Sequence, residues 1–414
     1  MTLRDESRLT SREVADRLGV RLETVYAYVS RGVLTSRRAP TGRGSTFDRA
    51  EVDALLDRER RGRPGRPPRP STWRGPVVDT DITLIEDGRL FFRGIDAVAL
   101  ARAGDLERAA QWLWTGETVP TRFLAPDEPL AAARAAVAAL PPTADLVSLL
   151  RVAVAAASSA DPLRYDTRGA AVLHTARGLL ATMVQALPRR DDPGAAVAEE
   201  DGDPLAARLW ARLTPLAADP GLLRCLDAAL VVLVDHDLAV STVAVRTAAS
   251  VRAHPYAVVS TGLSAMEGPL HGAASTLAHD VLHECLDGDP RLVVAEHLRA
   301  ARSLPGFGHR LYPDGDPRAA MLLDLLAGEP AAAAAVAAAH RLAAASGQRP
   351  NVDLALAALA LAAGMPRDAG EVVFSVARSV GWVAHALEEY DELPLRFRGQ
   401  GDYRGPQPPQ PLPW

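Results

Sequence analysis

The sequence PGFGHRLYPDGDPR, at residues 305–318, interrupts a long series of helix-forming segments and brings several polar side chains together. Gly306 and Gly308 allow the backbone to turn sharply and to approach a ligand closely. They precede His309 and Arg310, and Arg318 ends the stretch. Arginine binds carboxylates through two parallel hydrogen bonds, and histidine can polarise an oxygen. We therefore predict that this stretch binds a substrate with several carboxylates and a reactive carbonyl.

The chain around this stretch is predicted to be mainly α-helical. Its Ala- and Leu-rich segments are separated by Pro or Gly in nearly every case, and they show no repeat of fixed period. Before them, apolar and polar residues alternate within 77–92 around Asp87-Gly88, which predicts a β-hairpin. We expect helices at about 97–103, 106–115, 128–139, 145–158, 168–187, 204–214, 222–235, 239–252, 255–266, 271–286, 291–301, 318–326, 331–346, 352–363 and 370–390.

Length and composition indicate a globular protein with more than one domain. The chain has 414 residues, of which 48% are hydrophobic, enough for a large core. No apolar run reaches the roughly 18 residues of a membrane span, and the first residues do not resemble a secretory signal, so we expect a cytoplasmic protein. Cys225 and Cys285 lie in apolar helical contexts, which predicts two buried thiols and argues against a disulfide framework or a cysteine-based metal site. We expect no metal.

Charge divides the chain into a small basic part and a large acidic part. Residues 1–72 carry 16 arginines and 10 acidic residues, a net charge of +6, whereas the remainder carries 30 and 41, a net charge of −11. Residues 61–76 are dense in Arg, Pro and Gly, as is typical of a stiff linker. The loop at 191–203 and the Pro-rich tail at 406–414 are expected to be irregular.

The basic part, residues 1–60, reads as a small helical unit. Thr10 and Glu13 have the spacing of a capping box, and a second helix follows the first almost at once. Next come a basic hairpin wing within 33–47 and a third helix at 49–60. This pattern resembles the winged helix-turn-helix modules of the MerR and excisionase type, in which the second helix enters the DNA major groove. The alternative is a helical appendage that binds a protein partner. The residues expected to face DNA are Glu23, Thr24, Tyr26, Tyr28, Arg37, Arg38 and Arg43.

Four short polar stretches stand out in the apolar second half of the chain. They are Asp235-His236-Asp237, the segment GPLHG at 268–272, the stretch around His309, and Pro350-Asn351-Val352-Asp353. Each alone has a structural explanation, because a single His or Asp at a helix start is commonly a cap or a buried hydrogen-bonded group. Their combination is harder to explain structurally.

Together these stretches resemble the citrate synthases, including the 2-methylcitrate synthases, over roughly residues 73–405. Supporting motifs are Phe92-Arg93-Gly94, the segment WTGE at 114–117, and Ala377-Arg378 followed by the segment GWVAH at 381–385. Several independent motifs in the right order are more specific than any single one. Ser275 and Phe397 depart from the family's usual residues.

The resemblance implies a condensation of acetyl-CoA with oxaloacetate to give citrate and CoA. Removal of a proton from a weak carbon acid needs a base and stabilisation of the enol(ate) oxygen. By motif, Asp353 is the base and His271 the donor to the thioester oxygen. We expect the start of the following helix, from Gly272 onward, to keep His271 neutral. His309 polarises the ketone of oxaloacetate.

The same resemblance implies the binding residues and the assembly. It assigns His236, Arg318 and Arg378 to oxaloacetate, and Arg396 to the arginine that the family contributes from a neighbouring subunit, so we expect a homodimer. The CoA adenine is expected at Gly306, Phe307 and Gly308, with Arg302 as a phosphate contact. No permanent cofactor is expected, because the acyl-CoA is a co-substrate.

The family's architecture predicts a large domain of residues 77–271 and 366–405 and a small domain of residues 272–365 that closes over it. Two alternatives stay open. The acyl donor could be propionyl-CoA, which differs by one methylene worth only about 1–3 kcal/mol. The body could instead sense metabolites for a DNA-binding regulator.

Overall fold

The computed structural model describes residues 8–18, 20, 22–30, 34–38, 45–53, 78–119, 121–190, 202–268, 271–272, 274–300, 302–399 and 410. Two compact units, Met1–Val77 and Val78–Trp414, have separate internal contacts. The predicted linker, most of the loop at 191–203 and the tail apart from Gln410 lie outside the described residues.

Within its described residues, the smaller unit contains two complete helices, part of a third and a three-stranded antiparallel sheet. The sheet order is β1-β3-β2, so the predicted wing (β2 and β3) is joined by a strand that precedes the first helix and was not predicted. The capping box is confirmed, because the Thr10 backbone N–H donates to Glu13 Oε2 at 2.8 Å. Residues 49–53 of the predicted third helix are helical, and 54–60 lie outside the description. The elements are β1 (Arg8–Thr10), α1 (Ser11–Leu18), α2 (Leu22–Ser30), β2 (Ser36–Arg38) and β3 (Ser45–Asp48).

The larger unit opens with the predicted hairpin, formed by β4 (Thr83–Glu86) and β5 (Arg89–Phe92). Asp87 and Gly88 both have positive φ, 49° and 72°, the type I′ geometry that matches the twist of paired strands. A third short strand, β6 (Ile95–Asp96), pairs with β5 after a second positive-φ turn and extends the prediction.

The rest of the larger unit is helical, as predicted. Several helices begin one or two residues before the predicted start, because we treated a proline as a break, whereas proline at the first helical position costs nothing. The helices are α4 (Ala97–Ala103), α5 (Leu106–Thr115), α6 (Asp127–Ala138), α7 (Leu146–Ala160), α8 (Gly169–Gln185), α9 (Leu205–Leu213), α10 (Pro220–Leu233), α11 (Val240–Ser250), α12 (Pro255–Met266), α13 (Ala274–Asp287), α14 (Pro290–Arg299), α15 (Pro317–Ala327), η2 (Pro330–Ala332), α16 (Ala333–Ser346), α17 (Val352–Ala362) and α18 (Ala369–Asp391).

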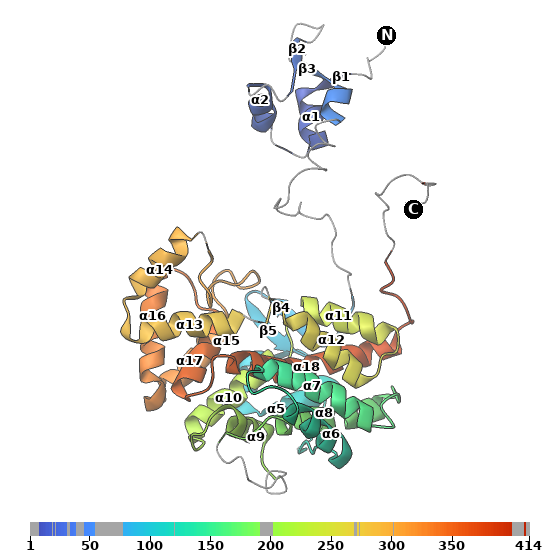
Figure 1. The fold of residues 1–414 in the computed structure, drawn as a ribbon, viewed down its shortest axis with the longest axis vertical. Coiled ribbons are helices and arrows are strands. Elements are labelled where there is room, and N and C mark those ends of the chain that lie inside the picture. Colours follow the sequence, from blue (N-terminus) through green and yellow to red (C-terminus); the bar gives the residue numbers. More distant parts are fainter. Residues whose placement is uncertain are drawn as a thin grey trace. The chain divides into compact units, whose positions relative to one another are not determined.

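Helix α18 organises the core of this unit. It crosses the middle of the unit and packs on α11, α12, α10, α5, α8 and α7, while α13 to α17 gather at one end (Figure 1). Helices α13, α15, α16 and α17 pack on one another and fall within the predicted small domain, whose boundaries remain a prediction. Cys225 in α10 and Cys285 in α13 are buried and free, as predicted.

In the described part of the chain, no single helix is both long and apolar enough to cross a membrane; only the bent pair formed by 317–327 and 330–346 reaches that length and apolarity together.

Candidate active site

The stretch at 305–318 lies against the segment that precedes α17. The Gly308 N–H donates to Arg349 O at 2.9 Å, and the Asn351 N–H donates to Gly306 O at 2.9 Å. Gly306 has φ +82°, and a Cβ there would meet Leu354 Cβ at 3.0 Å, so only glycine fits this approach. Two motifs that are more than thirty residues apart in sequence are therefore held side by side.

Three aromatic rings form the centre of the site. His236 Nε2 lies 2.9 Å from Tyr312 Oη. The His236 and His309 rings meet edge to face with centroids 5.1 Å apart, and the His309 and Tyr312 centroids are 4.9 Å apart. The loop before α11 supplies His236, and the stretch before α15 supplies the other two. The structure thus brings His236 and His309 together as predicted.

Two buried arginines border these rings. Arg318 in α15 forms a fork on Asp316, with Nε–Oδ1 at 2.9 Å and Nη2–Oδ2 at 2.8 Å, and its guanidinium lies 5.4 Å from the Tyr312 ring centroid. Arg378 in α18 donates from Nε to Leu233 O at 2.9 Å. Both side chains are almost fully buried, so each guanidinium is a fixed positive charge with remaining donors for an anion.

His271 lies in a turn rather than at the start of a helix. Its backbone N–H donates to Gly268 O at 2.9 Å, and α13 begins only at Ala274. The helix therefore starts later than the predicted residues 271–272, and its effect on His271 stays a prediction. Burial, followed by the nearby charge of Arg378, lowers the pKa of His271.

Contacts on two sides fix the His271 ring. Its Nε2 lies 2.8 Å from Ser241 Oγ, and its ring packs on Phe374 with centroids 6.2 Å apart. The same Phe374 ring also contacts a cation, because the Arg378 guanidinium lies 4.5 Å from its centroid.

Asp353 stands in the first turn of α17, directly after the Asn351 cap. Asn351 Oδ1 accepts the Asp353 backbone N–H at 3.0 Å, and Asn351 Nδ2 donates to Gly308 O at 3.1 Å. Burial raises the pKa of Asp353 to about 6, with Arg318 opposing the shift and the carboxylates of Asp316 and Glu371 adding to it. A carboxyl with this pKa is ionised at neutral pH and is a stronger base than an ordinary aspartate.

The three histidines are held neutral by the same surroundings. Burial lowers the pKa of His309 and lowers that of His236 well below its ordinary value, and the neighbouring arginines lower both further. Burial also lowers the pKa of Arg378 to about 10, where it is still charged at neutral pH. A neutral imidazole still carries one N–H, and a hydrogen bond from that N–H can polarise a carbonyl.

The charges of two arginines connect these groups electrostatically. The charge of Arg318 lowers the pKa values of Asp353, His309 and His236, and that of Arg378 lowers the pKa values of His271 and His236. Two fixed cations can hold a substrate with two carboxylates. Neutral imidazoles can polarise its carbonyl, and a carboxylate can remove a proton from a second substrate.

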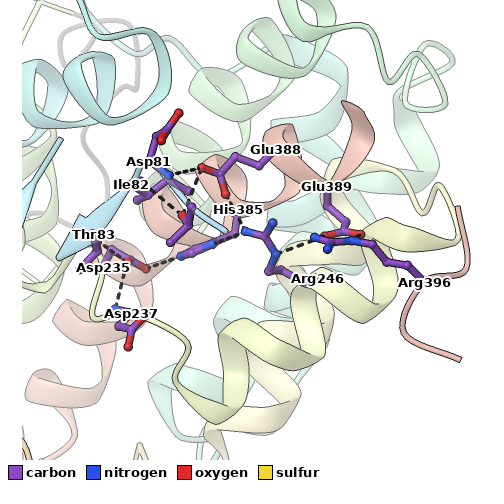
Figure 2. Close-up of polar contacts among 11 residues, drawn as sticks. Asp81, Ile82, Thr83, Asp235, Asp237, Arg246, His385, Glu388, Glu389 and Arg396 are labelled. Carbon is purple, nitrogen blue, oxygen red and sulfur yellow. Dashed lines mark hydrogen bonds and ion pairs between the residues drawn. The ribbon is translucent and has the colours of Figure 1, made fainter. Parts of the chain in front are cut away.

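Other predicted residues lie elsewhere. Arg302 is exposed. Arg396 forks onto Glu389 of its own chain, with both N–O distances 2.7 Å (Figure 2).

In the smaller unit Tyr26 is 52% exposed on α2 and Arg37 is exposed on β2, whereas Thr24 is half-buried and Tyr28 packs on the core. The side chains of Glu23 and Arg38, and all of Arg43, lie outside the described residues.

Sequence reasoning missed four residues of the site. Tyr312 and Asp316 belong to the quoted stretch, so their position was known but not their role. Phe374 could have been found from its spacing of four residues before Arg378 on one helix. No sequence signal marked Ser241.

Two hollows on the surface do not contain this cluster. Hollows of about 480 Å³ and 330 Å³ lie along α6, α7 and α8, and their walls include none of the residues above. We assign the chemistry to the buried cluster because charge and hydrogen-bonding groups converge there, which hollow size alone does not show.

Known proteins match both units. The family described as "Citrate synthase, C-terminal domain" matches residues 72–398, and a helix-turn-helix domain family matches residues 8–60. Citrate synthase from Saccharolobus solfataricus is 28% identical over 363 residues, covering 79% of this chain and 93% of that protein. Putative citrate synthase 2 from Mycobacterium bovis is 35% identical over 203 residues, 47% of this chain and 54% of that protein.

Solved structures share the fold. Citrate synthase from Thermotoga maritima aligns with a TM-score of 0.67 and 24% identity, covering 82% of this chain and 96% of that one. Citrate synthase from Thermoplasma acidophilum, solved as a ternary complex with carboxymethyl coenzyme A and oxaloacetate, aligns with a TM-score of 0.65, 23% identity and the same coverage of both chains. With the family match spanning most of the chain, the protein belongs to the citrate synthase family and carries an additional N-terminal helix-turn-helix domain.

Proposed function

We propose that this protein condenses acetyl-CoA with oxaloacetate to give citrate and CoA. Asp353 removes a proton from the α-carbon of the thioester, and His271 donates to the enol(ate) oxygen. The new carbon nucleophile attacks the ketone carbon of oxaloacetate, whose oxygen receives a proton from His309. Water then hydrolyses the thioester and releases CoA.

One observation supports this reaction most directly. The charge of Arg318 lowers the pKa values of both Asp353 and His309, so the proposed base for one substrate and the proposed activator of the other share a buried cation as an electrostatic neighbour. That arrangement suits a reaction in which two substrates must meet. His236, Arg318 and Arg378 hold the oxaloacetate, and the turn at Gly306, Phe307 and Gly308 with Arg302 binds the CoA nucleotide.

The activity is tested by CoA release. We expect oxaloacetate-dependent release of free thiol from acetyl-CoA, and a smaller rate from propionyl-CoA. A higher kcat/KM with propionyl-CoA would make the protein a 2-methylcitrate synthase instead. No release from either donor would contradict both enzymatic assignments and leave the metabolite-sensing alternative.

A homodimer belongs to the same proposal, because the family's trans arginine corresponds to Arg396. Within one chain that arginine is paired with Glu389, so partner contact would replace or share this pair. Light scattering of the full-length protein gives the mass. A monomer that retains full activity would contradict a trans role for Arg396.

A second function, DNA binding, is supported by the smaller unit. A helix-turn-helix family matches it, and α2, the expected recognition helix, exposes Tyr26. Binding should weaken steeply with salt, because arginines release counterions from phosphates, and it should disappear on deletion of residues 1–60. If a random DNA pool yields no preferred sequence, the unit is better explained as a protein-binding appendage.

A further inference from the structure

A line of buried polar side chains runs through the larger unit behind the site. Figure 2 shows it passing from the loop that precedes α11 to the chain after α18. Asp235, Arg246, His385 and Glu389 are each fully buried. Ionised side chains at such depth are retained only when each is paired. Each side chain of the line contacts the next, in the order Asp235, His385, Arg246, Glu389 and Arg396.

One face of α18 contacts three successive residues, from the last residue of α10 into the loop that follows it. Arg378 Nε donates to Leu233 O and the Gly381 N–H to Val234 O, each at 2.9 Å. His385 Nε2 lies 3.2 Å from Asp235 Oδ1. The three α18 residues are spaced i, i+3 and i+7, which places them on the same side of the helix.

Asp235 is the centre of the loop's own structure. Its Oδ2 accepts the Thr83 hydroxyl at 2.6 Å and the Asp237 backbone N–H at 3.2 Å. Asp237 has φ +56°, a strained value for a residue with a side chain. The carboxylate therefore stabilises the turn on which His236 is carried, and His236 in turn contacts Tyr312 of the site.

The hydrogen-bonding partners define the tautomer of His385. Its Nδ1 lies 2.8 Å from Arg246 Nη1, and an arginine nitrogen can only donate, so Nδ1 must accept and carries no proton. Nε2 then carries the proton, and it lies 3.2 Å from Asp235 Oδ1. Arg246 is itself held by Glu388 at 2.7 Å and Glu389 at 3.2 Å.

We infer that His385 is a positioning residue for the proposed condensation. It acts through Asp235, by the 3.2 Å contact of its protonated Nε2 with the carboxylate that holds the His236 turn, and Arg246 maintains the tautomer that this contact requires. His385 touches no substrate. Its role is to keep the His236 ring in position to bind oxaloacetate. To that extent the inference rests on the proposed function.

Two substitutions separate the two contacts of the ring. In His385→Gln the amide nitrogen takes the place of Nε2 and keeps a donor for Asp235. In His385→Asn the amide oxygen replaces Nδ1, but the side chain is too short to reach Asp235. The control is His340→Asn, on the exposed side of α16. Kinetics with each substrate, calorimetric oxaloacetate binding and melting temperature are measured on the full-length proteins.

We expect His385→Asn to weaken oxaloacetate binding and to lower kcat/KM for oxaloacetate by about 10- to 100-fold, as misplacement of a binding group by an ångström does. The KM for acyl-CoA should change little, and His385→Gln should recover most of the loss. Equal losses in the two variants, or a lowered melting temperature with unchanged oxaloacetate binding, would overturn the assignment. If His385→Asn does not fold, Thr83→Val removes the other side-chain donor to Asp235 and should weaken oxaloacetate binding in the same way; unchanged binding would overturn it.

A spectroscopic test does not depend on activity. With 15N-labelled histidine, the signals lost in His385→Gln should show a protonated Nε2 and an unprotonated Nδ1 at pH 7. The opposite tautomer or a doubly protonated ring would overturn the inference. Absence of turnover in the wild type would contradict the proposed reaction alone, because the tautomer and oxaloacetate binding are still measurable.

Discussion

Asp316 accepts the backbone N–H of Val352 at 3.0 Å through the same carboxylate that forks to Arg318. This contact joins the start of α15 to the start of α17, one residue before Asp353. The cation and the base are therefore held at a fixed separation by a shared, buried partner. Movement of one helix relative to the other would change the electrostatic balance at Asp353, where burial and Arg318 act in opposite directions.

Asp353→Asn should abolish condensation while leaving oxaloacetate binding nearly normal. Asparagine matches the shape of aspartate but cannot accept the proton, and a general base contributes about 10²- to 10⁴-fold. Thiol release and calorimetric titration with oxaloacetate measure the two effects. Asp287→Asn, at the exposed end of α13, is the matched control. Parallel loss of both properties would mean that Asp353 has a structural role.

The activity should depend on the ionisation of Asp353. Its pKa is about 6, and only the ionised form is a base, so kcat/KM for acyl-CoA should rise with pH up to about 6 and then level off. Two substitutions should move the Asp353 titration in opposite directions. Arg318→Gln removes a cation and should raise the pKa of Asp353, whereas Glu371→Gln removes a like charge and should lower it.

The carboxyl signal of Asp353 in 13C NMR reports these shifts without substrate, and its absence in Asp353→Asn assigns it. This assignment is needed because burial also raises the pKa of Asp227, to about 7. Shifts of the same sign in both variants would contradict the electrostatic explanation.

The raised pKa of Asp353 predicts that its ionised carboxylate lowers the stability of the folded protein. Its pKa in the folded protein exceeds the unfolded value of about 4, so the folded state binds more protons between about pH 4 and 6 and loses stability as pH rises through that window. At pH 7.5 Asp353→Asn should therefore be more stable than the wild type, by about 2–3 kcal/mol. Below about pH 4 the difference should vanish. Melting temperatures of both proteins at each pH decide the point.

Much of the fold could be predicted because the signals that begin and end helices and turns are local in the sequence. Asp-Pro and Asn caps, left-handed glycines and the Asp87-Gly88 turn act on their own neighbours, and the helices they delimit were found with small errors at their ends. Strand β1 was missed, because its three residues pair with β3 across some forty positions. Short non-local pairing leaves little trace in sequence.

The candidate site was predictable in its residues but not in its connections. Motifs named His236, His309 and Arg318, yet nothing in them indicated that a tyrosine hydroxyl would meet His236. The start of the helix after His271 was predicted too early, since the start of α13 depends on how the chain turns near Gly272 in three dimensions. Likewise, the pairing of Arg396 with Glu389 depends on the path of the chain after α18.

Gly381→Ala should destabilise the larger unit. A Cβ at this position would lie 2.2 Å from Val234 O and 2.6 Å from Asp235 Oδ1. Alanine normally favours a helix over glycine by about 1 kcal/mol, but the clash with backbone should reverse the sign and cost about 1–3 kcal/mol. Gly169→Ala, at the start of α8 with nothing within 4 Å, should be neutral or slightly stabilising. Similar melting temperatures for the two variants would contradict the close approach of α18 to the loop.

Tyr26→Ala should weaken DNA binding without unfolding the smaller unit. Tyr26 is 52% exposed, so its removal leaves the core of Val14, Leu18, Val25 and Phe47 intact. Tyr28 is the matched control, because it packs on that core, and Tyr28→Ala should lower stability as well as binding.

Fluorescence anisotropy with the selected DNA measures binding across a range of salt concentrations. Loss of a base contact should lower affinity by about 1–3 kcal/mol and leave the salt slope unchanged, whereas Arg37→Ala, at an exposed position on β2, should reduce that slope by about 1 if it contacts a phosphate. Full DNA affinity in both Tyr26→Ala and Arg37→Ala would show that this face of the unit does not bind DNA.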